Sequence, residues 1–154
     1  MSLSLEELFR PSGPEEKIQP VNSKGLADMV GLPAAILQAL ESIGLLIPSV
    51  TPEGKLYDGL ALRIVRLIKQ LLDMGLVPSD LDYYRVYIDS LRTEARVVHD
   101  KILHLPGRTA WVSGKEIKET LESLRTAVTM HVQRQLVLEL HNDEDATQPR
   151  SDRQ

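Results

Sequence analysis

Polar side chains in the first half of the sequence have the chemistry to bind nucleic acid. Gln38 carries an amide that can form two hydrogen bonds with the edge of an adenine base. Lys55 lies at the tip of an expected hairpin, and Arg63 and Arg66 lie one turn apart on an expected helix. These three carry the positive charge that phosphates attract. Each residue also has a simpler interpretation, as a solvated side chain or as the partner of a nearby carboxylate.

Aromatic side chains are concentrated in the middle of the chain. Tyr83, Tyr84 and Tyr87 lie within one and a half helical turns. On a helix Tyr84 joins an apolar seam, while Tyr83 and Tyr87 lie four residues apart and stack on a neighbouring face. Packing is the favoured role for these rings and for Trp111, with contact to a small-molecule effector as the alternative.

The sequence shows none of the patterns typical of metal sites or active sites. It has no cysteine, and its four histidines form neither an HExxH motif nor a pair four residues apart. A nucleophile elbow, a P-loop and a dinucleotide fingerprint are also missing. We therefore expect no metal site, no cofactor and no enzymatic activity.

Charge and composition limit the remaining classes of function. The 154-residue chain carries 18 Lys and Arg against 22 Asp and Glu, a net charge of -4. Binding to a polyanion therefore depends on how the charges are distributed. No apolar run approaches the roughly 20 residues of a membrane span. We expect a cytoplasmic protein with no membrane partner.

The charges of residues 22–77 cancel. The segment has five positive and five negative side chains, so its net charge is zero. The positive ones are Lys24, Lys55, Arg63, Arg66 and Lys69, and the negative ones are Asp28, Glu41, Glu53, Asp58 and Asp73.

Short elements are expected to hold the candidate nucleic-acid ligands. Ser23 is a cap for a helix over Lys24–Val30, and a second helix starts at Pro33 and ends at Ile43, before Gly44. Two short helices joined by a tight glycine turn form a helix-turn-helix pattern.

A hairpin and a third helix follow this pair. Ile47–Thr51 and Lys55–Tyr57 flank a turn at Pro52 and predict the hairpin, and Leu60–Met74 predicts the helix. The expected buried side of that helix is formed by Leu60, Ile64, Leu67, Ile68 and Leu71.

The second half predicts two long helices. Apolar residues recur at alternating spacings of three and four from Leu81 to Leu105, after a cap at Ser79. A final helix starts at a capping box, Ser113 to Glu116, and its apolar positions reach Leu140. A monomer would leave much of this apolar surface in water, so we expect a homodimer with a coiled coil. The candidate dimerisation residues are Ile88, Leu91, Val98, Leu121, Leu124 and Val128.

The order helix, glycine turn, helix, hairpin, helix is the plan of a winged helix-turn-helix domain, and its residues resemble the MerR-type transcription regulators. Residues 25–48, GLADMVGLPAAILQALESIGLLIP, resemble the opening segment of that family, including Glu41 followed by Gly44-Leu45-Leu46. Residues 62–76, LRIVRLIKQLLDMGL, match its third helix. The resemblance covers roughly residues 23–78.

The resemblance implies a DNA-binding transcription regulator that acts as a homodimer on a two-fold operator in double-stranded DNA. The helix Ala34–Ile43 would enter the major groove, and the wing would contact the adjacent backbone. RNA polymerase or a small-molecule effector is a further partner of such a regulator. The residues expected to contact DNA are Lys24, Gln38, Ser42, Lys55, Arg63 and Arg66.

The sequence also departs from the MerR pattern. Where the family has Arg-Tyr-Tyr or Arg-Tyr-Trp before the glutamate, this chain has Gln38, Ala39 and Leu40. This departure and the neutral charge sum support an alternative, a degenerate winged-helix module that binds protein and not DNA.

The expected fold is mainly α, with a winged helix-turn-helix domain followed by long helices. Its divisions are an N-terminal appendage or linker (1–21), the winged domain (22–78), a helical dimerisation and effector region (79–141) and a disordered polar tail (142–154).

Overall fold

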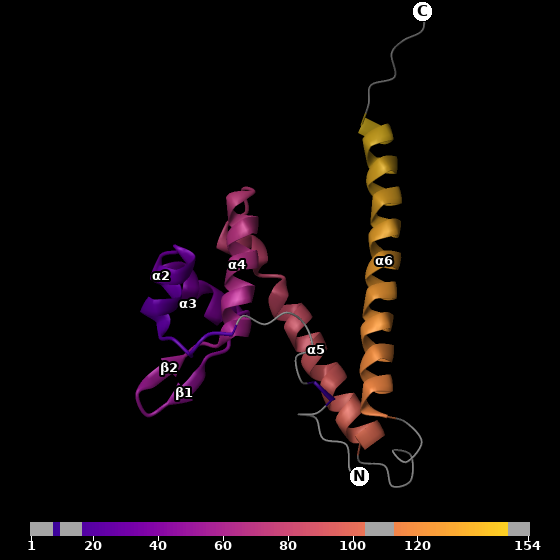
Figure 1. Ribbon diagram of the computed structural model, residues 1–154. Helices are drawn as coiled ribbons and strands as arrows, with labels where there is room; N and C mark the ends of the chain where they lie inside the picture. Colours follow the sequence, from indigo (N-terminus) through magenta and orange to yellow (C-terminus); the bar gives the residue numbers. More distant parts are fainter. Residues whose placement is uncertain (1–7, 10–16, 104–112, 148–154) are drawn as a thin grey trace, which may run out of the picture. The chain divides into compact units, whose positions relative to one another are not determined.

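The computed structural model describes residues 8–9, 17–103 and 113–147. The chain divides into two units, Pro11–Lys101 and the combination of Met1–Arg10 with Ile102–Gln154. The first unit contains helices α2 to α5 and a small sheet, and the second contains the long helix α6 (Figure 1). The fold is mainly α, a winged helix-turn-helix domain followed by long helices, as the sequence predicts.

The helix-turn-helix consists of α2 (Ser23–Val30) and α3 (Ala34–Ile43). The side chain of Asn22 accepts a hydrogen bond from the N–H of Gly25 at 2.8 Å. Asn22 therefore caps α2, which begins one residue earlier than predicted, and the expected cap Ser23 is its first residue. Between the two helices the chain direction changes by 110°.

Gly44 ends α3 where the sequence predicts. Its φ of 96° lies in the left-handed region, which glycine adopts without strain. Its N–H donates to the carbonyl oxygens of Leu40 and Glu41, which satisfies the last turn of the helix. A Cβ at this position would lie 3.5 Å from Cδ1 of Ile88, so a later helix of the same unit covers the turn.

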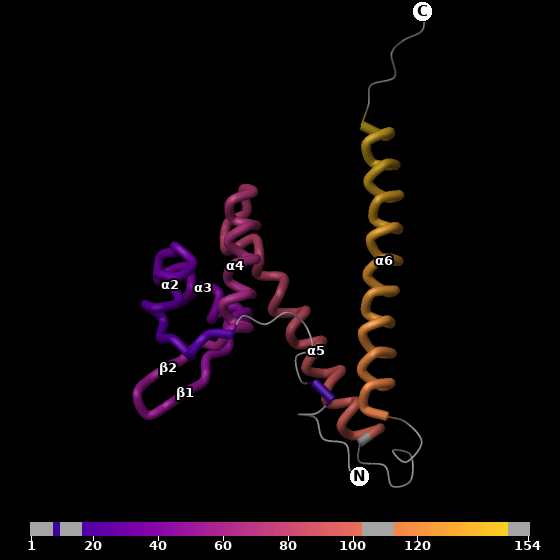
Figure 2. The backbone as a smooth tube through the Cα atoms, in the orientation of Figure 1, coloured from indigo at the N-terminus to yellow at the C-terminus, as the bar shows by residue number. Residues whose placement is uncertain are grey.

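The wing is an antiparallel hairpin of β1 (Ser49–Thr51), which is shorter than predicted, and β2 (Gly54–Leu56), which begins one residue earlier than predicted. Figure 2 traces the chain from α3 through this hairpin to α4. The hydroxyl of Thr51 donates to the carbonyl oxygen of Gly54 at 2.7 Å and closes the turn. Val21 and Tyr57 exchange backbone hydrogen bonds of 3.0 and 2.8 Å, which attach the base of the wing to the chain before α2.

Helix α4 (Gly59–Asp73) begins at Asp58, whose carboxylate accepts a hydrogen bond from the N–H of Ala61 at 2.9 Å. Of its predicted buried side, Ile64, Ile68 and Leu71 lie in or against the core, whereas Leu60 and Leu67 are exposed. The hydrophobic core lies between α2, α3 and α4, and its buried members are Leu26, Val30, Leu37, Leu40, Ile43, Leu46, Tyr57, Ala61, Leu62, Val65, Ile68 and Leu81.

The helix predicted after Ser79 is divided into three pieces. A 3₁₀ turn, η1 (Pro78–Leu81), places Leu81 in the core, and the Asp80 carboxylate accepts from the N–H of Val77 at 2.8 Å. Helix α5 (Tyr84–Val98) follows, and a π-helical turn, η2 (His99–Leu103), continues it. The predicted seam positions up to Ile102 are buried or half-buried, whereas Leu105 lies outside the described residues.

Helix α6 (Gly114–Thr147) begins at the predicted cap, because the Ser113 hydroxyl accepts from the N–H of Glu116 at 3.1 Å. It ends later than expected. Residues 142–147, which the sequence assigns to a disordered tail, are helical. From residue 126 to residue 147 every side chain of this helix is exposed.

Candidate nucleic-acid interface

The solvent face of α3 carries small and uncharged polar side chains. Ala34, Ala35, Gln38 and Ser42 are all exposed, while Leu37, Leu40 and Ile43 turn into the core. Ala34, Ala35 and Ser42 lie four, three and four residues from Gln38, so the four side chains share one side of the helix. The hydroxyl of Ser42 donates to the carbonyl oxygen of Gln38 at 3.0 Å, which commits its proton within the helix.

The wing is joined to α3 by an ion pair that sequence reasoning missed. The Nζ of Lys55 lies 2.6 Å from Oε1 of Glu41, with the Lys55 side chain 54% exposed and that of Glu41 24% exposed. This hydrogen bond, together with the negative charge of Glu41, raises the pKa of Lys55 above its ordinary value. The predicted phosphate ligand therefore has a carboxylate partner in the chain itself.

Two hydroxyl groups extend this pair into a network. The buried Tyr57 donates to Oε2 of Glu41 at 3.2 Å, and the hydroxyl of Ser23 donates to the Tyr57 oxygen at 3.4 Å. The network ties β2, α3 and the first residue of α2 together. It attaches the wing to α3 through side chains.

The remaining expected DNA ligands lie on two other helices. Lys24 is exposed in the first turn of α2, Arg66 is exposed on α4, and Arg63 is half-buried one turn before it. Both arginines take part in interactions within the chain. Lys69, also on α4, pairs with Asp73 at 3.1 Å. At least two of the five positive charges of residues 22–77 are therefore partly neutralised by carboxylates.

The comparison with protein families identifies this domain. Residues 21–82 match the family described as MerR HTH family regulatory protein. They form a MerR-type domain. The match agrees with the resemblance in the sequence, and it includes the helix-turn-helix, the wing, α4 and η1. No curated protein and no solved structure gives a significant match to the chain.

The tyrosines at the end of the MerR-type domain pack differently from the prediction. Tyr83 and Tyr87 each contact the ring of Tyr84, with centroid distances of 4.7 and 5.8 Å. Tyr84 packs against the hydrophobic core, and its partial burial raises the pKa of its hydroxyl, as does the neighbouring Tyr83. Tyr83 and Tyr87 remain more than half exposed. Trp111 lies outside the described residues.

The expected dimerisation residues fall into two groups. On α5, Ile88 and Leu91 are half-buried and Val98 is buried within the chain itself. On α6, Leu121 is half-buried, whereas Leu124 and Val128 are 57% and 51% exposed. Only the α6 group therefore presents open apolar surface to a second molecule.

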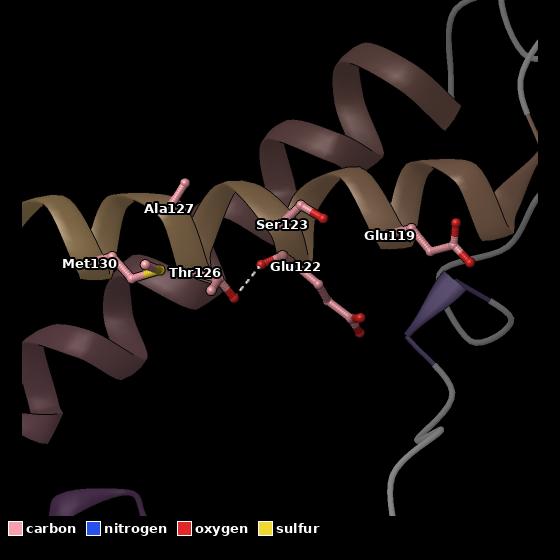
Figure 3. A pocket seen from close by; sticks show the side chains of 6 residues that line it. All are labelled: Glu119, Glu122, Ser123, Thr126, Ala127 and Met130. Carbon is pink, nitrogen blue, oxygen red and sulfur yellow. Dashed lines mark hydrogen bonds between the residues drawn. The ribbon is translucent and has the colours of Figure 1, made fainter.

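A shallow hollow of about 390 Å³ lies on α6. The described side chains that line it all belong to this one helix (Figure 3). They include Thr126, whose hydroxyl donates to the carbonyl oxygen of Glu122 at 3.0 Å. The lining residues of the hollow are Glu119, Glu122, Ser123, Thr126, Ala127 and Met130.

The described part of the chain was compared with the requirements of a metal site and of a membrane-spanning helix, and it meets neither within a single cluster or a single helix. Within residues 8–9, 17–103 and 113–147, no three or more His, Asp or Glu side chains are grouped so that they could hold a metal ion. Over the same ranges no single helix has both the length and the apolar character to cross a membrane. The bent pair α2 and α3 meets that test jointly, by length and composition alone.

Proposed function

We propose that this chain is a transcription regulator that binds double-stranded DNA as a homodimer at a two-fold operator. Helix α3 enters the major groove, and the β1–β2 wing contacts the adjacent backbone. The observation that carries the proposal is the open polar face of α3, centred on Gln38, beside a wing fixed by the Lys55–Glu41 pair in a MerR-type domain.

Each expected DNA ligand has a role in this proposal. Gln38 contacts base edges, while Lys24, Arg63 and Arg66 contact phosphates from two other helices. Lys55 reaches a phosphate by exchanging its carboxylate partner for one. Ser42, with its hydroxyl proton committed to the Gln38 carbonyl oxygen, supports the segment of α3 that carries Gln38.

Self-association is supported by the apolar side chains that α6 leaves in water. Leu124, Val128, Val132, Leu136 and Leu140 recur at every fourth residue, and each is about half exposed. Covering them requires another surface, and a second copy places two heads on one duplex. Residues 79–141 then serve as the dimerisation region, and an effector or RNA polymerase bound there, next to Tyr83 and Tyr87, would alter the relative pose of the heads.

A salt titration on DNA tests the proposal. The full chain is titrated into fluorescent genomic DNA fragments, and the affinity is measured between about 50 and 200 mM salt. We expect affinity to fall steeply with salt, because each phosphate contact contributes a slope of about -0.9. Lys24→Ala removes one contact from each protomer and should therefore reduce the slope of the dimer by about 1.8.

Lys115→Ala is the matched control, since it removes the same charge from the exposed start of α6. It should leave the slope unchanged. Absence of binding at the lowest salt would overturn the proposal. It would favour the second candidate, a winged-helix module that binds protein, which the neutral charge sum and the two exposed alanines of α3 support.

Self-association is tested separately by sedimentation. Val128→Asp should shift the chain from dimer to monomer, whereas Thr129→Asp, at the next exposed position of α6, should leave the mass unchanged. A wild-type chain that sediments as a monomer at all concentrations would contradict the dimer. These variants avoid Ile88 and Val98, where a charge would also disturb the packing within the chain.

A further inference from the structure

The exposed face of α3 restricts which base pairs the helix can distinguish. In the major groove each side-chain type has preferred partners. Arginine and lysine bind guanine, amides bind adenine, carboxylates accept from cytosine, and methyl groups contact thymine. The side chains available on α3 therefore limit the sequences that it can read.

Guanine and cytosine lack their preferred charged partners on the exposed face of this helix. The α3 sequence AAILQALESI contains neither arginine nor lysine, so the two-point contact with guanine cannot form from it. Its one carboxylate, Glu41, accepts from Lys55 at 2.6 Å and from Tyr57 at 3.2 Å, and its side chain is only 24% exposed. A cytosine amino group would have to compete with the charged amine of Lys55 for this carboxylate.

The groups that remain on the exposed face suit A·T pairs. Gln38 presents an amide, which matches the N6 and N7 atoms of adenine. Ala34 and Ala35 precede it by about one turn and present methyl groups, which can pack against the thymine methyl. Because both alanines are small, they also let the start of α3 approach the base edges closely, which the short glutamine side chain requires.

We infer that α3 reads A·T base pairs, with Gln38 as the adenine-specifying residue and Ala34 and Ala35 as thymine-methyl contacts. This inference rests on the proposed function, since it concerns the same interface. It adds the class of DNA sequence to which the chain binds. The preference of Gln38 for adenine over guanine should be on the order of tenfold in affinity.

Selection from a library of random duplexes tests the inference. The full wild-type chain, Gln38→Ala and Gln38→Arg are each used to enrich bound duplexes, and the enriched sequences are compared. We expect A·T pairs in each wild-type half-site, and loss of the preference at one position in Gln38→Ala. Gln38→Arg should change that position to guanine.

Lys24→Ala is the matched control. It should weaken binding to all sequences alike and leave the enriched bases unchanged, because a phosphate contact carries no sequence information. The inference would be overturned if the wild type enriched a G·C-rich half-site, or if the wild type and Gln38→Ala enriched the same half-site. Either result would leave the DNA-binding proposal intact. Failure to retain any duplex at low salt would overturn both.

Discussion

The Lys55–Glu41 ion pair predicts that removing a negative charge from α3 changes DNA binding through the wing. Glu41→Gln keeps the shape of the side chain and leaves an oxygen to accept from the Tyr57 hydroxyl, so the buried tyrosine keeps its partner. It removes the carboxylate that lies 2.6 Å from Nζ of Lys55. Lys55 can then contact a phosphate without first giving up an ion pair.

The size of the effect is set by the phosphate contact of Lys55 in each of the two heads, which Glu41 opposes in the wild type. A full contact contributes about -0.9 to the slope of log affinity against log salt, so the slope for the Glu41→Gln dimer should be steeper by at most about 1.8. Between about 50 and 200 mM salt, the variant should lose at most about 12-fold more affinity than the wild type does. Its binding at the lowest salt should be correspondingly tighter.

A double-mutant cycle separates the release of Lys55 from the removal of a negative charge near DNA. Affinity is measured by fluorescence anisotropy for the wild type, Glu41→Gln, Lys55→Ala and the double variant. The gain from Glu41→Gln should disappear when Lys55 is already alanine. An equal gain in both backgrounds would refute the reasoning, because the gain would then not act through Lys55.

The core, the first helix cap and the tyrosines give three further predictions. In urea unfolding, Leu62→Ala at a fully buried position should cost about 2–5 kcal/mol, and Leu67→Ala on the exposed side of α4 much less. Asn22→Ala should cost about 1 kcal/mol, because the Gly25 N–H loses its acceptor. Since the pKa of Tyr84 is raised in the folded chain, stability should fall as the pH rises above about 10, less so in Tyr84→Phe. The first prediction would be wrong if both leucine variants lost the same unfolding free energy, and the second if Asn22→Ala lost none. The third would be wrong if Tyr84→Phe and the wild type showed the same dependence of stability on pH.

The helix-turn-helix could be predicted closely because its ends are fixed by local signals. Gly31 and Gly44 end their helices in the left-handed conformation that the sequence anticipates, and both helix starts fall within one residue of the prediction. The sequence does not decide between Asn22 and Ser23 as the cap, because both residue types cap helices equally well.

The buried face of α4 could be predicted only in part, for a physical reason. The helix has apolar residues on two neighbouring faces, and one contains Leu60 and Leu67 at helical spacing. Periodicity identifies both faces as apolar, but only packing against α2 and α3 decides that Ala61, Leu62 and Val65 enter the core. The outer face stays exposed in the isolated chain.

For the candidate interface, the sequence predicts which side chains lie on an exposed surface better than it predicts their hydrogen-bond and ion-pair partners. Gln38 could be proposed from its position on an expected exposed helix face. The ion pair between Glu41 and Lys55 joins residues 14 positions apart on different elements, and no local spacing rule links them. The three-piece division of residues 78–103 was also missed, since an unbroken apolar seam runs across both of its junctions.

Site-specific photo-crosslinking tests the central claim most directly. A photoreactive amino acid replaces Gln38 in one version of the full chain and Leu138, an exposed position on α6, in another. Each version is irradiated with bound double-stranded DNA. The account predicts crosslinks to DNA from position 38 and none from position 138. Bound DNA that crosslinks from position 138 and not from position 38 would contradict it.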